Sequence, residues 1–207
     1  MLCLDNTLSM QTNLVGELSL VCVSALSQSL HSLEVGKVGV LSFGTNVREI
    51  CPIHESASHT SSVRELMRDF QFNEESTSSF SDALPAVVQK CSHAFESDAE
   101  GGGLVLIITD GRFDKEKVRP HLQHLIADGH IPVLIVVDAN KEESILAVTS
   151  IHFEEEVGPL KKRKIVRKPF LSQSDCPFPF YAVIQEPTQL PATLADILRQ
   201  WIQISSK

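Results

Sequence analysis

Short apolar runs alternate with longer amphipathic stretches along these 207 residues, and this alternation restricts the fold more than any other feature of the sequence. Apolar residues recurring at helical spacing predict four longer helices, at 14–33, 80–95, 115–128 and 190–204. Strands that alternate with helices are typical of a mostly parallel sheet with helices on both faces. The sequence therefore predicts an α/β fold, with strands at 2–4, 38–43, 47–51, 104–109, 131–137 and 178–185.

Size and composition favour one compact domain over residues 1–207. With 43% apolar residues, a chain of this length can bury one substantial core. No run approaches the roughly 20 apolar residues of a membrane-spanning helix, and no basic start precedes an apolar run as in a secretion signal. Five scattered cysteines form no C-x-x-C pair, so we expect free and mostly buried thiols.

Two acidic residues each come directly after an apolar strand. Asp5 follows the first predicted strand, and Asp110 follows the strand at 104–109. If these strands are parallel neighbours, both carboxylates lie at the carboxyl edge of the sheet, where open α/β folds place ligands. The hydroxyls of Thr7 and Ser9 join them there. The result is an all-oxygen site suited to a hard divalent cation.

The spacing D-x-T-x-S at positions 5–9 is similar to the D-x-S-x-S of the metal-ion-dependent adhesion site in von Willebrand factor A domains. This resemblance implies a Rossmann-like α/β domain whose metal ligands include Asp5, Thr7, Ser9 and Asp110. A second loop in that family supplies a hydroxyl five residues before an Ala-Leu pair, which falls on Ser78, with Thr77 beside it as the alternative. The implied metal is Mg²⁺, or another divalent cation such as Mn²⁺ or Ca²⁺.

Three further stretches, at 33–44, 177–181 and 190–201, resemble the midasin family of very large ring ATPases in ribosome assembly. The likeness is to the C-terminal metal-site domain of that family. It implies a nuclear protein-binding domain without catalysis of its own, with an AAA+ ring that would lie upstream. It also implies a partner, namely a ubiquitin-like domain of a pre-60S assembly factor that completes the metal coordination with a Glu or Asp side chain.

A basic segment stands apart from the acidic remainder of the chain. Its six cations are Lys161, Lys162, Arg163, Lys164, Arg167 and Lys168, and the other 12 basic residues face 26 acidic ones, a net charge of −14. Because like charges repel and prolines bracket the segment, we expect an extended, solvated loop insertion at 155–176. The functional hypothesis is a nuclear import signal for an import receptor, with a plain solvated loop as the alternative. Direct nucleic-acid binding is not expected of the acidic body, and contact with ribosomal RNA is a lesser alternative for the basic segment.

Two other functions fit an acid after the first strand. A Mg²⁺-dependent phosphatase of the haloacid-dehalogenase kind needs D-x-D after this strand. Thr7 stands where the second Asp would be, so the acid that this chemistry needs is absent. A metal-independent A-domain scaffold of the proteasome-receptor type also begins with an apolar residue and Asp-Asn, but the stretches at 33–36 and 198–201 argue against it. Phosphate-binding and nucleophile-elbow motifs are absent, and His121 and His124 lack a metalloprotease frame. We therefore predict no catalytic residues.

Overall fold

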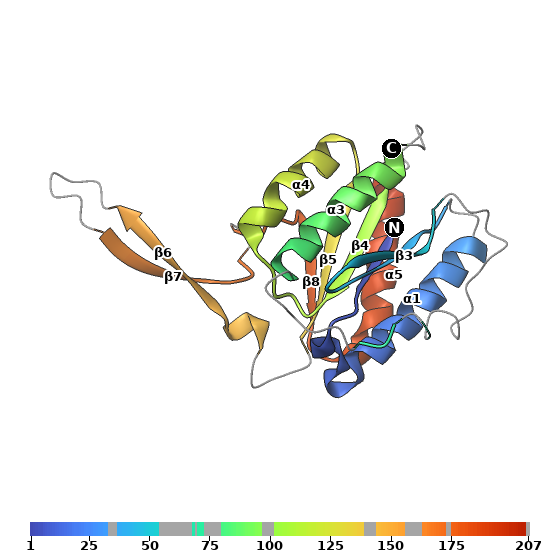
Figure 1. Cartoon of the computed structure of the whole chain (residues 1–207), viewed down its shortest axis with the longest axis horizontal. Coiled ribbons are helices and arrows are strands. Elements are labelled where there is room, and N and C mark those ends of the chain that lie inside the picture. The colour runs from blue at the N-terminus through green and yellow to red at the C-terminus, as the bar shows by residue number, and fades with distance from the viewer. Residues whose placement is uncertain are drawn as a thin grey trace.

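The computed structural model describes residues 1–32, 37–53, 68, 70–72, 80–96, 102–138, 144–155, 163–172 and 175–205. Its main element is a six-stranded sheet in the order β3-β2-β1-β4-β5-β8 (Figure 1). The strands are β1 (Leu2–Asp5), β2 (Val40–Phe43), β3 (Val47–Cys51), β4 (Leu104–Thr109), β5 (Ile131–Val137) and β8 (Phe180–Ile184). Neighbours pair in parallel except β3, which runs antiparallel to β2 at one edge. The predicted α/β fold with a mostly parallel sheet is confirmed.

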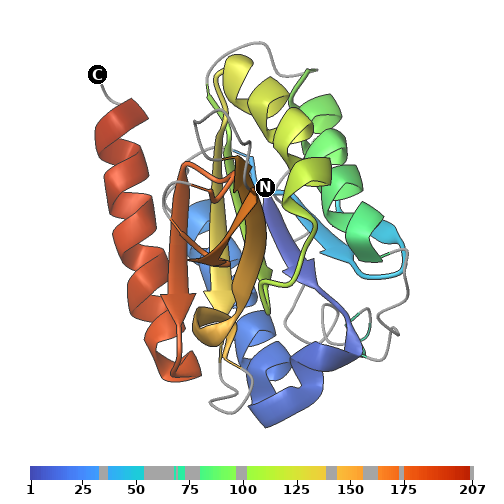
Figure 2. The ribbon, with the colours of Figure 1, turned by 90° about the vertical axis from the view of Figure 1, so that its left-hand side faces the viewer.

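Four longer helices cover the two faces of this sheet. Helices α3 (Phe80–Glu96) and α4 (Lys115–Ala127) lie on one face, and α1 (Val15–Ser32) and α5 (Leu190–Ser205) lie on the other (Figures 1 and 2). Each helix falls within a few residues of its predicted range. Within the described residues, no helix has the length and apolar character that a bilayer crossing requires.

The central strands are mostly apolar, with polar residues only at their carboxyl ends in β1 and β4, because helices cover both of their faces. In β4, Val105 and Ile107 pack into the core beneath α3 and α4, while Leu106 and Ile108 pack toward α1 and α5. All six residues of β4 are buried. This two-sided burial fixes the strand register, because a slip by one residue would exchange the two faces.

The five cysteines are free thiols, as expected. Cys3, Cys22 and Cys91 are buried, and Cys51 and Cys176 are partly buried. The Sγ atoms of Cys3 and Cys91 lie 3.6 Å apart between β1 and α3. Burial raises the pKa of the Cys3 thiol well above its ordinary value, so this thiol stays protonated and behaves as a core residue.

The predicted loop insertion is instead a β-hairpin. Strands β6 (Thr149–Glu155) and β7 (Arg163–Pro169) form a separate two-stranded antiparallel sheet, which extends away from the body of the domain (Figure 1). Its register places Glu154 opposite Lys164 and Glu155 opposite Arg163. The two backbones pair over seven residue pairs, so the solvated loop predicted from repulsion among the cations is wrong over residues 163–169.

Candidate metal centre

Strands β1 and β4 are direct parallel neighbours, so their carboxyl ends meet at one edge of the sheet. The condition on which the candidate site depended is therefore met. Leu4 pairs with Ile108, which brings Asp5 beside Thr109. Thr109 Oγ1 donates a hydrogen bond of 2.7 Å to Asp5 Oδ2. Strand β4, which precedes Asp110, therefore also holds the Asp5 carboxylate from the side.

The loop after β1 folds back onto the other oxygen of the same carboxylate. Asp5 Oδ1 accepts hydrogen bonds from the backbone N–H of Thr7, at 2.9 Å, and from Thr7 Oγ1, at 2.7 Å. Thr7 Oγ1 and Ser9 Oγ lie 2.9 Å apart. The carboxylate and both hydroxyls thus form one continuous cluster of oxygens. The chain then continues into the short 3-10 helix η1 (Leu8–Leu14).

Exposure increases along this cluster. Asp5 and Thr7 are completely buried, Asp110 is partly buried, and Ser9 is exposed. Asp110 lies in the turn after β4, where its Oδ1 accepts a hydrogen bond of 3.3 Å from the backbone N–H of Arg112. The site therefore has a buried floor and an exposed side at Ser9.

Electrostatics show that the two carboxylates act on each other. Burial, followed by the negative charge of Asp110, raises the pKa of Asp5 to about 7, although hydrogen bonds from Thr109 and Thr7 oppose the shift. A cation between the carboxylates would remove this mutual repulsion. No three His, Cys, Asp or Glu side chains come together in the described part of the chain, so the candidate ligands are two carboxylates and hydroxyls. Such an all-oxygen set fits a hard divalent cation.

The remaining predicted site residues are only partly covered by the structure. Thr77 and Ser78, the candidates for the second metal loop, lie outside the described residues, and so do Lys161 and Lys162. Arg163, Lys164, Arg167 and Lys168 belong to strand β7 and not to a loop. Among these last four, Arg167 is exposed and Lys168 is partly buried.

A third acid at a strand end, Asp138, follows β5 and binds residues that come shortly after it in the chain. Its carboxylate accepts hydrogen bonds from Ser144 Oγ, at 2.6 Å, and from the backbone N–H of Ile145, at 3.2 Å. These contacts fix the start of the short helix η2 (Ile145–Ala147). Position at a strand end therefore does not by itself identify a site residue.

Sequence reasoning missed two residues that support the cluster. Thr109 is the one hydroxyl residue in the otherwise apolar strand β4, and that contrast was available as a signal. Asn6 lies between Asp5 and Thr7, is buried, and accepts a hydrogen bond of 2.9 Å at Oδ1 from the backbone N–H of Phe72. Its partner is 66 residues away, so no local pattern indicates this contact.

Two midasins are similar to this chain in sequence. The chain is 28% identical to midasin of Giardia intestinalis over 206 residues, which cover 98% of this chain and 4% of that protein. It is 26% identical to midasin of Dictyostelium discoideum over 209 residues, covering 99% of this chain and 3% of that protein. The likeness to midasin is thus confirmed over nearly the whole chain, which spans only 3–4% of the length of these relatives.

Solved structures share the fold at low sequence identity. The conserved hypothetical protein BatB from Bacteroides thetaiotaomicron superimposes with a TM-score of 0.63 and 13% identity, covering 98% of this chain and 97% of that one. A von Willebrand factor type A protein from Catenulispora acidiphila gives a TM-score of 0.56 and 10% identity, covering 95% of this chain and 40% of that one.

The family model described as the von Willebrand factor type A domain matches residues 1–157. Domains of this family generally act as interaction modules without catalysis, and they commonly bind a divalent metal ion. The match covers the first strand, the oxygen cluster and five of the six strands of the main sheet. On this evidence the chain belongs to the von Willebrand factor type A domain family.

Proposed function

We propose that this domain binds a protein partner through a divalent metal ion, and that it does so as part of a midasin-like ATPase of ribosome assembly. The observation that carries the proposal is the buried carboxylate of Asp5. It lies in a cluster with the hydroxyls of Thr7 and Ser9, and the negative charge of Asp110 raises its pKa. A buried acid repelled by a second acid is an arrangement that a cation stabilises.

The chain's own residues divide the work at this site. Asp5 and Asp110 supply negative charge, Thr7 and Ser9 supply neutral oxygens, and one of Thr77 and Ser78 adds a further hydroxyl. Thr109 and the backbone of Thr7 orient the Asp5 carboxylate. A bound Mg²⁺, or Mn²⁺ or Ca²⁺ in its place, would supply positive charge, and a carboxylate from the partner can complete its coordination. Exposed Ser9 marks the side from which that carboxylate arrives.

The partner we propose is a ubiquitin-like domain of a pre-60S assembly factor, which contributes a Glu or Asp side chain. Support comes from the similarity to midasin over 98–99% of this chain. The chain as a whole carries a net charge of −8, so an acidic partner needs a local attraction. A metal site provides that attraction and makes binding specific for an acidic side chain.

Titration calorimetry with a purified ubiquitin-like domain tests the proposal. We expect binding in Mg²⁺, loss of binding in EDTA, and loss of binding for Asp5→Ala, for Asp110→Asn and for Glu→Gln at the partner's essential acid. Asp138→Asn is the matched control, because it removes a charge from the neighbouring strand end. Its amide oxygen still accepts from the backbone N–H of Ile145, and its amide N–H2 can donate to Ser144 Oγ. Equal affinity of wild type and Asp110→Asn would contradict the site.

One observation favours a second candidate, a metal-independent scaffold of the proteasome-receptor type. Both oxygens of the Asp5 carboxylate already accept hydrogen bonds from within the domain, from Thr7 and Thr109. A carboxylate satisfied in this way can serve as a structural element without a metal. Partner binding that persists unchanged in EDTA would support this candidate.

The proposed location is the nucleus, since assembly of the large ribosomal subunit begins there. The basic residues of the hairpin segment, Lys161 to Lys168, are the proposed signal for an import receptor. Exposed Arg167 on β7 is accessible to such a receptor.

A further inference from the structure

Phe72 has an unusual backbone conformation in a buried position. Among the residues that the structure describes, it is the one non-glycine residue with a positive φ, at 49°. A bulky side chain in the left-handed region is strained, so surrounding contacts must hold it there. Its side chain is 5% exposed. Strain of this kind often marks residues that hold a functional site in shape.

The first contact that holds Phe72 is with the metal loop. Its backbone N–H donates to Asn6 Oδ1 at 2.9 Å, and Asn6 is the residue between Asp5 and Thr7. The backbone N–H of Asn6 itself donates to the carbonyl oxygen of Phe43, at the end of β2, at 2.7 Å. Asn6 is therefore held by two elements that are distant in sequence.

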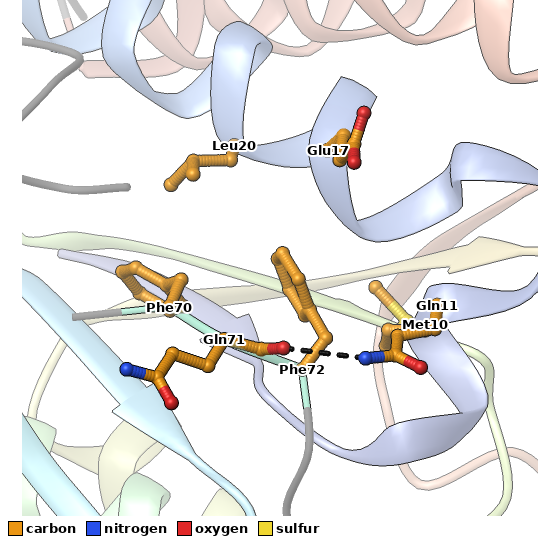
Figure 3. A pocket seen from close by; sticks show the side chains of 7 residues that line it. All are labelled: Met10, Gln11, Glu17, Leu20, Phe70, Gln71 and Phe72. Atoms are coloured by element: carbon orange, nitrogen blue, oxygen red, sulfur yellow. Dashed lines mark hydrogen bonds between the residues drawn. The ribbon is translucent and has the colours of Figure 1, made fainter. Parts of the chain in front are cut away.

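The second contact is with the start of helix α1. A Cβ placed on Gly16 would lie 2.8 Å from three carbons of the Phe72 ring, so only glycine fits beneath the ring. Phe72, Met10, Leu20 and Phe70 line a cavity of about 370 Å³. Figure 3 shows the side chains of these residues around it. At the edge of this cavity, Gln11 Nε2 donates to the carbonyl oxygen of Gln71 at 3.4 Å.

These contacts bracket the metal loop. Asn6 precedes the hydroxyls of Thr7 and Ser9, and Gly16 follows them at the beginning of α1. We propose that Phe72 is a positioning residue of the metal site, which holds the segment from Asn6 to Gly16 so that both hydroxyls face the Asp5 carboxylate. This inference rests on the proposed metal-binding function.

Phe70 provides a matched control for Phe72. Both rings are buried, line the same cavity and have centroids 6.1 Å apart. The contacts with Asn6 and Gly16 described above belong to Phe72. Phe70→Ala should therefore reproduce the loss of a buried ring without a direct effect on the metal loop.

The test combines two measurements on Phe72→Ala, Asn6→Leu and Phe70→Ala. Without metal, amide hydrogen exchange is followed at Thr7 and Met10, whose N–H groups bond within the loop to Asp5 Oδ1 and the Thr7 carbonyl oxygen. With metal, the affinity for Mg²⁺ is measured by calorimetry. We expect faster exchange at both amides and about tenfold weaker Mg²⁺ binding in the first two variants, the loss typical of residues that support metal ligands. Phe70→Ala should lower the melting temperature with Mg²⁺ affinity unchanged.

The outcomes separate the inference from the proposed function. If wild type does not bind Mg²⁺, the proposed function fails, and faster exchange in Phe72→Ala would still show that Phe72 positions the loop. If wild type binds Mg²⁺ and Phe72→Ala changes neither exchange nor affinity, or only as much as Phe70→Ala does, the inference is overturned. Phe72→Leu, which keeps apolar volume, replaces the alanine variant if that variant does not fold.

Discussion

Thr109 Oγ1 lies 2.7 Å from Asp5 Oδ2, a contact between residues 104 positions apart in the chain. It joins the two strands whose ends carry the candidate metal ligands. Because a hydrogen bond to a carboxylate favours its charged form, Thr109 keeps Asp5 more ionised than burial alone would allow. Thr109 thus prepares Asp5 to bind a cation without being a predicted ligand itself.

Replacing Thr109 with valine should weaken metal binding. Val keeps the volume of Thr but removes the donor, so the pKa of Asp5 rises and protons compete for its carboxylate at higher pH. We expect about tenfold weaker Mg²⁺ binding at neutral pH. Calorimetry across a pH series measures this, and Thr109→Ser, which keeps a hydroxyl, should bind as wild type does. Equal pH profiles for all three proteins would contradict the role of the hydroxyl.

The metal-free domain should become more stable as pH falls from about 7 toward 4. Burial and the charge of Asp110 raise the pKa of Asp5 from 3.8 to about 7, so the folded state holds a proton that the unfolded state releases. The contribution of Asp5 to stability is thus fully present below the unfolded pKa and is lost as pH rises through the folded one. Urea unfolding in EDTA at several pH values measures it.

Asp5→Asn is the control for this pH dependence, since it carries no titrating group. At pH 7.5 in EDTA it should be more stable than wild type, by at most a few kcal/mol, because each pKa unit is worth about 1.4 kcal/mol. Added Mg²⁺ should stabilise wild type and have little effect on Asp5→Asn. A wild-type domain whose stability in EDTA stays constant from pH 4 to 7 would show that Asp5 ionises normally.

Two glycines offer a matched pair for testing the turn after Asp110. Gly111 and Gly129 have nearly the same positive φ, 90° and 88°. A Cβ on Gly111 would lie 2.6 Å from Val136 Cγ1, whereas nothing lies within 4 Å of one on Gly129. Gly129→Ala should therefore cost only the backbone strain, about 1–2 kcal/mol.

Gly111→Ala should cost that strain and a further 1–3 kcal/mol or so for overpacking against Val136. Urea unfolding of both variants gives the difference. Gly111→Ala should also weaken Mg²⁺ binding, since it displaces the turn that carries Asp110. Equal losses of stability in the two variants would show that Val136 on β5 moves aside for the added Cβ without a loss of folding free energy.

The basic segment should direct a reporter to the nucleus. Residues 160–170, fused to a cytoplasmic fluorescent protein, contain all six cations. We expect nuclear accumulation of the fusion, and cytoplasmic retention when Ala replaces all six. Fluorescence microscopy is the measurement. A fusion that stays cytoplasmic, together with a nuclear full-length protein carrying the six alanines, would exclude this segment as the signal.

Local patterns predicted the elements of the main sheet because its central strands are apolar on both faces and end in acids. That pattern placed Asp5 and Asp110 at strand ends, but the β1–β4 pairing itself was only assumed from it, because pairing order depends on how the strands pack. The β6–β7 hairpin was missed because its strands pair with each other along their backbones, and counting cations within one segment ignores the partner strand. The strained conformation of Phe72 depends on Asn6 and Gly16, which are distant in sequence.

Strand β1 lies between β2 and β4 and pairs with both along its length. A partner attached at Asp5 would therefore pull on the end of a strand that is anchored on two sides. A force along that strand loads the hydrogen bonds to both neighbours in shear, so they must break together and not one after another. Under the proposed function, the metal site therefore lies at the end of a strand that passes tension to both of its neighbours.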